Sequence, residues 1–253
     1  MARKYVVTGS ASGMGKATAR LLADQGHEVI TLDLRDADVI ADLATPEGRH
    51  AGIDGIAARS GGSVDALIHC AGIAAYVPKT MAINFFGAVA MLEGLRPMLA
   101  NGTDPRAVAV SSYAATMSPD PELVAAALAG DEAKALELGA RHEVANYTSS
   151  KAALAQWCRA AAVRSEWAGA GILLNTVAPG MVDTPMIAHR LNTRENYEEF
   201  KRLLPLPIDR PARPEELAEL LAFLASPANS YIIGQNIYAD GGTEAVVRGP
   251  ERI

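Results

Sequence analysis

The sequence has little cysteine and no long apolar run. Its 2 cysteines, Cys70 and Cys158, lie far apart and form no CxxC pair, so neither a disulfide framework nor a cysteine-rich zinc site is expected. No segment approaches the roughly 18 apolar residues of a membrane helix, and residues 1–10 hold no signal-peptide core. The 5 histidines form no HExxH motif. These absences predict a cytoplasmic protein without a metal site or membrane span.

Concentrated positive charge is also missing. The chain carries 23 Lys and Arg against 29 Asp and Glu, and its net charge is -6. Without a basic stripe, nucleic acid is not an expected partner. The hydrophobic share of 49% and the charged share of 21% are those of a globular protein. The length of 253 residues, without a linker or repeat, predicts one domain over residues 1–253.

Strand-like and helix-like segments alternate along the chain. Apolar runs and punctuating glycines predict strands at 5–7, 28–33, 64–70, 107–110, 171–177 and 236–239. Helical periodicity predicts helices at 15–25, 80–100, 147–167 and 214–225. This alternation predicts βαβ units and therefore an α/β fold with a Rossmann-type, doubly wound parallel sheet.

One stretch interrupts the alternation. Residues 117–146 follow a strand end and hold two expected helices, at 121–128 and 131–142. Because open sheets bind ligands at the carboxyl ends of their strands, this helical insertion is expected to form a lid together with residues 186–204. A surface excursion or an assembly element is the alternative. Its six acidic residues indicate a solvated face, or one inward carboxylate for an amine-bearing substrate.

Residues 8–15, TGSASGMG, form a glycine-rich turn between the first expected strand and helix. Glycines let backbone N–H groups approach a phosphate at the helix N-terminus. Asp33 ends the next strand, where a carboxylate accepts hydrogen bonds from the adenosine ribose and repels a 2′-phosphate. The pattern predicts a dinucleotide site that prefers NAD(H), with Arg35 as the group that would favour NADP.

Tyr147 and Lys151 stand four residues apart, on one face of an expected helix. A phenol with a pKa of about 10 is a poor base at neutral pH, and a nearby ammonium favours its ionised form. The pair therefore suits proton transfer with an alcohol. Ser112 closes an earlier strand and Asn84 lies in the helix expected at 80–100.

Together these motifs resemble the short-chain dehydrogenase/reductase family over essentially the whole chain. The matching motifs are TGSASGMG, Cys70-Ala71-Gly72 (with Cys where Asn is usual), Asn84, Ser112, the Tyr147–Lys151 pair and Pro179-Gly180. The resemblance implies that Tyr147 is the general acid/base and that Ser112 holds the substrate oxygen. It also implies that Lys151 binds the nicotinamide ribose and lowers the pKa of Tyr147, while Asn84 anchors a proton-relay water.

The same resemblance implies a set of cofactor-binding residues. They are Gly9, Ser12, Gly13, Met14, Gly15, Asp33, Asp42, Leu43, Cys70, Ala71, Gly72, Tyr147, Lys151, Pro179, Gly180, Val182 and Thr184. Within this set Asp42 and Leu43 would flank the adenine. Cys70 itself is expected to be a buried, unreactive thiol.

Residues 33–43, the insertion and the C-terminal stretch most resemble the bacterial hydroxysteroid dehydrogenase/carbonyl reductase branch of the family. The branch implies NAD-dependent interconversion of a secondary alcohol and a ketone on a hydrophobic substrate, such as a 3-hydroxysteroid or another bulky carbonyl compound. It also implies a homodimer, with the family's tetramer as the alternative. A smaller aryl, cyclic or amino ketone is the alternative substrate. A non-catalytic NAD-binding redox sensor is the alternative of another class.

Overall fold

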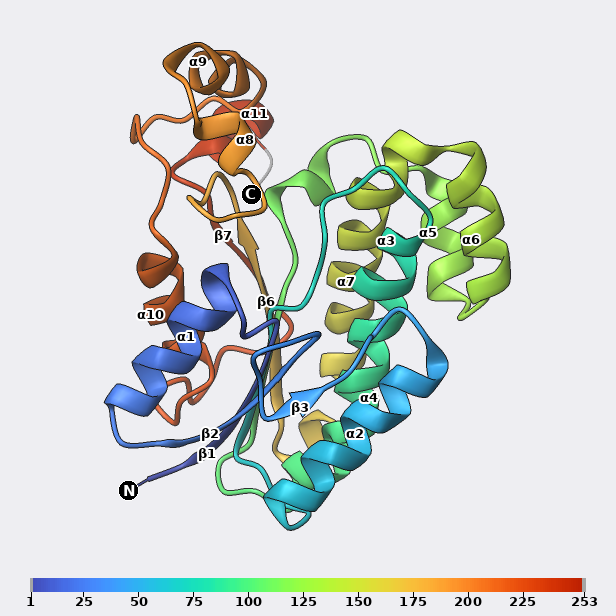
Figure 1. Cartoon of the computed structure of the whole chain (residues 1–253), viewed down its shortest axis with the longest axis vertical. Helices are drawn as coiled ribbons and strands as arrows, with labels where there is room; N and C mark the ends of the chain where they lie inside the picture. The colour runs from blue at the N-terminus through green and yellow to red at the C-terminus, as the bar shows by residue number, and fades with distance from the viewer. Residues whose placement is uncertain (1, 252–253) are drawn as a thin grey trace.

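The strands build one parallel sheet in the computed structural model, which describes residues 2–251 (Figure 1). The sheet has 7 strands in the order β3-β2-β1-β4-β5-β6-β7. In chain order they are β1 Lys4–Thr8, β2 Glu28–Asp33, β3 Val39–Ile40, β4 Ala66–His69, β5 Arg106–Val110, β6 Leu173–Pro179 and β7 Asn236–Ala239. Every neighbouring pair is parallel, and the order reverses at β1 and β4. The predicted doubly wound parallel sheet is confirmed.

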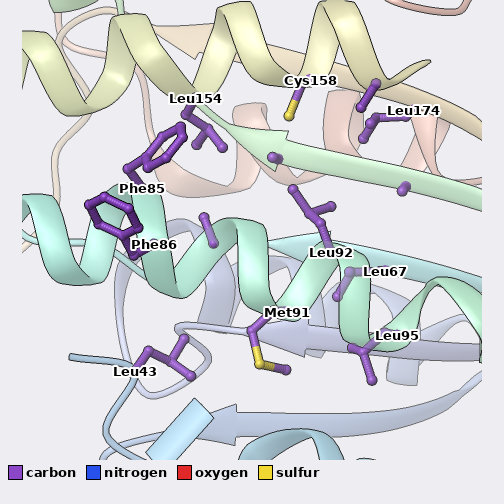
Figure 2. Close-up of a cluster of buried hydrophobic side chains, with 14 of the residues drawn as sticks. Leu43, Leu67, Phe85, Phe86, Met91, Leu92, Leu95, Leu154, Cys158 and Leu174 are labelled. Carbon is purple, nitrogen blue, oxygen red and sulfur yellow. The ribbon is translucent and has the colours of Figure 1, made fainter. Parts of the chain in front are cut away.

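Helices cover both faces of the sheet. On one face α1 (Gly13–Asp24) packs beside α10 (Pro214–Leu224), and on the other lie α2 (Pro46–Ser60), α4 (Ala88–Ala100) and α7 (Asn146–Ala162) (Figure 1). Each face encloses its own cluster of buried apolar side chains. The cluster beneath α4 and α7 is shown in Figure 2, where side chains from helices and sheet interdigitate. Both faces of the strands are therefore buried, which is why the strands are apolar runs.

Two predicted boundaries were wrong. The helix expected at 147–167 ends at Ala162, and a short 3₁₀ turn, η4 (Ala168–Ala170), leads into Gly171. Gly171 has a φ of 75°, a left-handed conformation that ends helical turns and cannot begin a strand. The following strand therefore runs over Leu173–Pro179 and not over 171–177.

Helix α2 is an element that the periodicity of the sequence does not reveal. It contains three glycines and few apolar residues, which lowers its intrinsic helix propensity. Its N-cap, Thr45, accepts a hydrogen bond from the Gly48 N–H, and Gly61 ends it with a φ of 68°. The glycines allow close packing: a Cβ added at Gly52 would lie 3.0 Å from Leu32 Cδ1. Tertiary contact, rather than propensity, accounts for this helix.

The insertion holds the two predicted helices, α5 (Pro121–Leu128) and α6 (Glu132–Arg141), followed by the 3₁₀ turn η3 (Glu143–Ala145). They stand outside α7 and the short helix α3 (Lys79–Met81), as Figure 1 shows. Their apolar face joins the hydrophobic core, through the buried residues Leu123, Val124, Ala126, Ala127, Ala135 and Leu138. Met117 and Leu128 in the same segment stay exposed, and that the insertion covers a substrate stays a prediction.

Three of the six acidic residues of the insertion have partners within it. Asp120 and Asp131 cap the N-termini of α5 and α6, and Glu137 pairs with Lys134 and Arg141. The residues 186–204, expected as the second half of a lid, form α8 (Ala188–Leu191) and α9 (Arg194–Leu203). Figure 1 shows them across the carboxyl edge of the sheet from the insertion, near α11 (Thr243–Arg248).

Candidate active site

The glycine-rich turn joins β1 to α1 at the carboxyl edge of the sheet. Gly9 has a φ of 69°, and a Cβ there would lie 2.6 Å from the Ala71 nitrogen. A Cβ at Gly15 would lie 2.2 Å from the Gly9 oxygen. The turn therefore lies directly on the segment that follows β4, and only glycine permits that approach. The first turn of α1 leaves its backbone N–H groups at this edge, an arrangement that suits a pyrophosphate.

Asp33 is fixed beside this turn. Its Oδ2 accepts a hydrogen bond from the Ala11 N–H at 2.9 Å, and its Oδ1 accepts one from the Leu34 N–H at 2.7 Å. Each carboxylate oxygen keeps a further lone pair, so the group can also accept from two hydroxyls. Arg35, in contrast, is exposed and lies 3.9 Å from Asp36. The residues present thus fit the adenosine ribose of a dinucleotide without a 2′-phosphate.

Ser112, Tyr147 and Lys151 meet where α7 crosses the end of β5. Ser112 follows β5, caps the 3₁₀ turn η2 (Tyr113–Thr116), and accepts a hydrogen bond from the Ala114 N–H at 3.1 Å. Lys151 Nζ donates to the Val110 oxygen at 2.8 Å. Tyr147 lies one helical turn before Lys151 on α7, on the same helix face. The sequence-predicted Ser, Tyr and Lys are therefore gathered at one place.

Burial governs the protonation states of this group. It raises the pKa of Tyr147 above 10.0, and a hydrogen bond with Ser112 acts in the opposite direction. The Lys151 ammonium donates to the Val110 carbonyl, and that Lys151 lowers the pKa of Tyr147 stays a prediction. Burial lowers the pKa of Lys151 to about 8. At neutral pH Tyr147 is consequently a neutral phenol, the form that donates a proton.

Asn84 lies in a π-helical segment, η1 (Ala82–Gly87), where the sequence predicts an ordinary α-helix. Its Oδ1 accepts from the Ile73 N–H at 2.9 Å, and its Nδ2 donates to the Ile73 oxygen and to Ser150 Oγ. A Cβ added at Gly72 would lie 3.0 Å from Asn84 Oδ1 and 3.4 Å from Lys151 Nζ. Asn84 and Lys151 therefore flank the same glycine. Local π-helix is common at functional sites, where it redirects a side chain.

Among the other predicted cofactor residues, Thr184 lies against the glycine-rich turn. A Cβ added at Gly13 would lie 3.2 Å from Thr184 Cγ2, which places the segment after β6 beside the turn. Gly180 and Val182 contact residues outside the turn: Gly180 lies directly on Asp240, and Val182 forms a parallel bridge with Ala212. Ser12 is the extended N-cap residue of α1. That the whole set binds the cofactor stays a prediction.

The positions of Leu43 and Asp42 limit which of their atoms a cofactor could contact. The Leu43 side chain points into the hydrophobic core near Met91 (Figure 2), so only the Leu43 backbone is available to an adenine. Asp42 accepts from the Ala44 N–H at 2.9 Å and pairs with Lys79 at 3.3 Å. The Ala44 hydrogen bond is the main cause of the lowered pKa of Asp42. Its carboxylate is therefore ionised.

His69 and Cys70 complete this edge. Cys70 is half-buried and not fully buried as predicted, and desolvation raises the pKa of its thiol to about 12, which agrees with an unreactive cysteine. His69, which sequence reasoning missed, is 1% exposed, and its Nδ1 lies 3.0 Å from Thr8 Oγ1. Burial, assisted by the Lys151 charge, lowers the pKa of His69 to about 3. The imidazole is therefore neutral.

Two other kinds of site, a membrane span and a metal centre, are absent from residues 2–251. Within that range no helix is long and apolar enough to cross a membrane. No group of three or more His, Cys, Asp or Glu side chains in the same range has the geometry to hold a metal ion.

Comparison with known proteins identifies relatives over nearly the whole chain. A family model described as short chain dehydrogenase matches residues 3–125, and one described as enoyl-(acyl carrier protein) reductase matches residues 134–244. The 3-alpha-hydroxysteroid dehydrogenase/carbonyl reductase of Comamonas testosteroni is 39% identical, over 96% of this chain and 97% of its own. The cis-4-hydroxycyclohexanecarboxylate dehydrogenase of Sinomonas cyclohexanicum is 36% identical over the same shares.

A solved structure is also similar to this chain over nearly its whole length. The 3-alpha-hydroxysteroid dehydrogenase from Pseudomonas sp. B-0831, complexed with NADH, is 40% identical and superposes with a TM-score of 0.89, covering 97% of this chain and 98% of that one. The doubly wound sheet, the glycine-rich turn and the Ser–Tyr–Lys group define a nucleotide-dependent oxidoreductase. With relatives of this identity and coverage, the chain belongs to the short-chain dehydrogenase/reductase family.

Proposed function

We propose that this protein interconverts a secondary alcohol and a ketone with NAD(H) as the cofactor. The observation that carries the proposal is the meeting of Ser112, Tyr147 and Lys151 beside the glycine-rich turn. The relatives named as 3-alpha-hydroxysteroid dehydrogenases, one of them complexed with NADH, support it. The spacing of three residues between Tyr147 and Lys151 favours carbonyl chemistry over enoyl reduction.

In this proposal each residue has one role. The bound nicotinamide cofactor supplies or accepts the hydride. Tyr147 as a neutral phenol donates the proton to the ketone oxygen during reduction, and its phenolate takes up the alcohol proton during oxidation. The Ser112 hydroxyl holds the same oxygen, Lys151 binds the nicotinamide ribose, and Asn84 orders the path that returns a proton to Tyr147.

The preference for NAD(H) follows from charge at the ribose position. Asp33 is held by two backbone N–H groups, so its carboxylate cannot swing away from an incoming 2′-phosphate. Two negative charges within about 5 Å repel by roughly 1 to 3 kcal/mol at the effective dielectric of a protein surface. That energy corresponds to about a 10- to 100-fold preference.

The substrate is proposed to be hydrophobic. Large apolar side chains stay exposed on the loops that follow β4, β5 and β6, namely Tyr76, Val77, Met117 and Met186. Such side chains favour a bulky carbonyl compound. A cyclic ketone is the second candidate, because one relative is named as a hydroxycyclohexanecarboxylate dehydrogenase. An amine-bearing substrate gains no support, since Asp120, Asp131 and Glu137 are occupied as caps and ion-pair partners.

The test is a steady-state comparison of NADH and NADPH across steroid, cyclic and aryl ketones, with the reverse alcohol panel. We expect kcat/KM to be higher with NADH by about 10- to 100-fold, and Asp33→Asn to remove most of that preference. Glu28→Gln, which removes one exposed charge at the other end of the same strand, serves as the control. Equal use of both cofactors by the wild-type protein would refute the role of Asp33. Cofactor binding without any turnover would favour the redox sensor.

A further inference from the structure

Arg49 is a buried cation on α2 that no sequence motif singles out. It is 7% exposed, and its guanidinium makes hydrogen bonds in three directions. Nε donates to the Leu43 oxygen at 2.9 Å, and Nη2 donates to the Ala82 oxygen at 3.0 Å and to the Ala44 oxygen at 3.4 Å. Nη1 and Nη2 form a bidentate pair with Glu132, at 2.7 and 2.6 Å. One side chain thus joins parts of the chain that are far apart in sequence.

Each of these partners belongs to a different part of the proposed site. Leu43 and Ala44 form the segment whose backbone is proposed to face the adenine. Ala82 is the first residue of the π-helical segment η1, which carries Asn84. Glu132 is the first residue of α6 in the insertion. Figure 1 shows the start of α2 lying just below that insertion.

The same segment is tightly enclosed by glycines. A Cβ added at Gly48 would lie 2.0 Å from the Asp42 oxygen, and one added at Gly87 would lie 2.8 Å from the Leu43 oxygen. The backbone at Asp42 and Leu43 is therefore held between the start of α2 and the end of η1. Because this backbone is closely packed, a shift of the Leu43 carbonyl would displace both the start of α2 and the end of η1.

We propose that Arg49 is a positioning residue that holds the adenine-side segment and the Asn84 segment in one fixed arrangement, with Glu132 as its counter-charge. The inference rests on the proposed function. A guanidinium is suited to this task because its planar donors reach two carbonyls and a carboxylate at once, which an ammonium does not. Glu132 is required because a buried cation without a partner is strongly destabilising. The insertion then serves the site by supplying a charge.

Three variants test the proposal: Arg49→Lys, Arg49→Met and Glu132→Gln. We expect Arg49→Lys to weaken NADH binding by about tenfold and to lower kcat by about tenfold, since one ammonium replaces five directed donors. Glu132→Gln keeps a hydrogen-bond acceptor, so we expect a loss of about threefold in NADH affinity. Arg59→Gln is the matched control: it removes the same charge from the exposed end of α2 and should change neither constant.

The readouts separate a positioning role from a merely structural one. NADH binding is measured by fluorescence titration and folding by circular dichroism. The pH profile of kcat reports the pKa values of Tyr147 and Lys151, the titrating groups of the site that contains Asn84. We expect folded Arg49→Lys to shift that profile, whereas a purely structural role predicts an unchanged profile and affinity.

If both Arg49 variants fail to fold, Glu132→Gln decides, and wild-type NADH affinity and kcat in that variant would overturn the inference. If the wild-type protein binds NADH and turns over ketones while the variants keep its NADH affinity and kcat, only the inference is overturned. A wild-type protein that binds no nicotinamide cofactor overturns the proposed function and the inference with it.

Discussion

Lowering the pH should destabilise this protein through His69, a side chain within the sheet and not on the surface. His69 is buried, and its pKa is lowered to about 3 from 6.5. Thr8 Oγ1 accepts the Ala71 N–H at 3.2 Å and lies 3.0 Å from His69 Nδ1, so the neutral ring shares a hydrogen bond with Thr8.

The sign of the effect follows from proton binding. In the unfolded chain His69 takes up a proton as the pH falls through about 6.5, whereas the folded protein resists protonation until about pH 3. The unfolded state then binds more protons, so the free energy of unfolding decreases as the pH falls through this window. Between pH 7 and pH 5 the loss from this one group is about 2 kcal/mol.

Urea unfolding at pH 7 and pH 5 measures this loss of unfolding free energy directly. Carboxylates titrate in the same range, so the relevant quantity is the difference between the wild-type protein and His69→Gln, which has no titrating group at this position. We expect the wild-type protein to lose about 2 kcal/mol more than His69→Gln over this interval. His50→Gln, at an exposed position of α2, should behave like the wild-type protein. Equal losses in wild type and His69→Gln would refute the reasoning.

Two further predictions concern the insertion and the assembly. Replacing residues 119–143 by a Gly/Ser linker should destabilise the protein by at least about 3 kcal/mol in thermal unfolding, because it removes core side chains and the counter-charge of Arg49. A folded, NADH-binding variant that loses activity only on large ketones would instead support the lid. We also predict a homodimer, since the insertion covers the outer side of α7 and leaves one symmetric surface for pairing. Light scattering at micromolar concentration tests this, and a tetramer would contradict it.

The parts of the fold that the sequence predicts are those encoded locally. Apolar runs gave six of the strands, and the glycine-rich turn was placed because its glycines, its strand and its helix are adjacent in the chain. Ser112, Tyr147 and Lys151 were recognised by type and spacing, and their gathering follows from the parallel strand order. That residues 1–253 act as one catalytic domain stays a prediction.

The parts that the sequence did not predict depend on contacts between distant segments. Helix α2 is stabilised by glycine contacts with β2 and β3, which no helical periodicity reveals. In the sequence, Arg49 is indistinguishable from an ordinary surface charge. Its role depends on three separate segments that contact it in the folded protein. The sequence does not distinguish the apolar residues of the insertion that pack on the body from those that stay exposed, and the lid stays a prediction. His69 gave no signal, since a histidine in an apolar run is compatible with many environments.

The most direct test of the central claim is the turnover of Tyr147→Phe, measured beside its affinity for NADH. Removing the phenol hydroxyl deletes the proposed proton donor while the ring, the helix and the Lys151 contact with Val110 remain. We expect kcat for ketone reduction to fall by at least about 100-fold, the usual size of a general acid/base contribution. The Kd for NADH should change little, by about twofold at most. Near-wild-type turnover in a folded Tyr147→Phe protein would contradict the proposed mechanism.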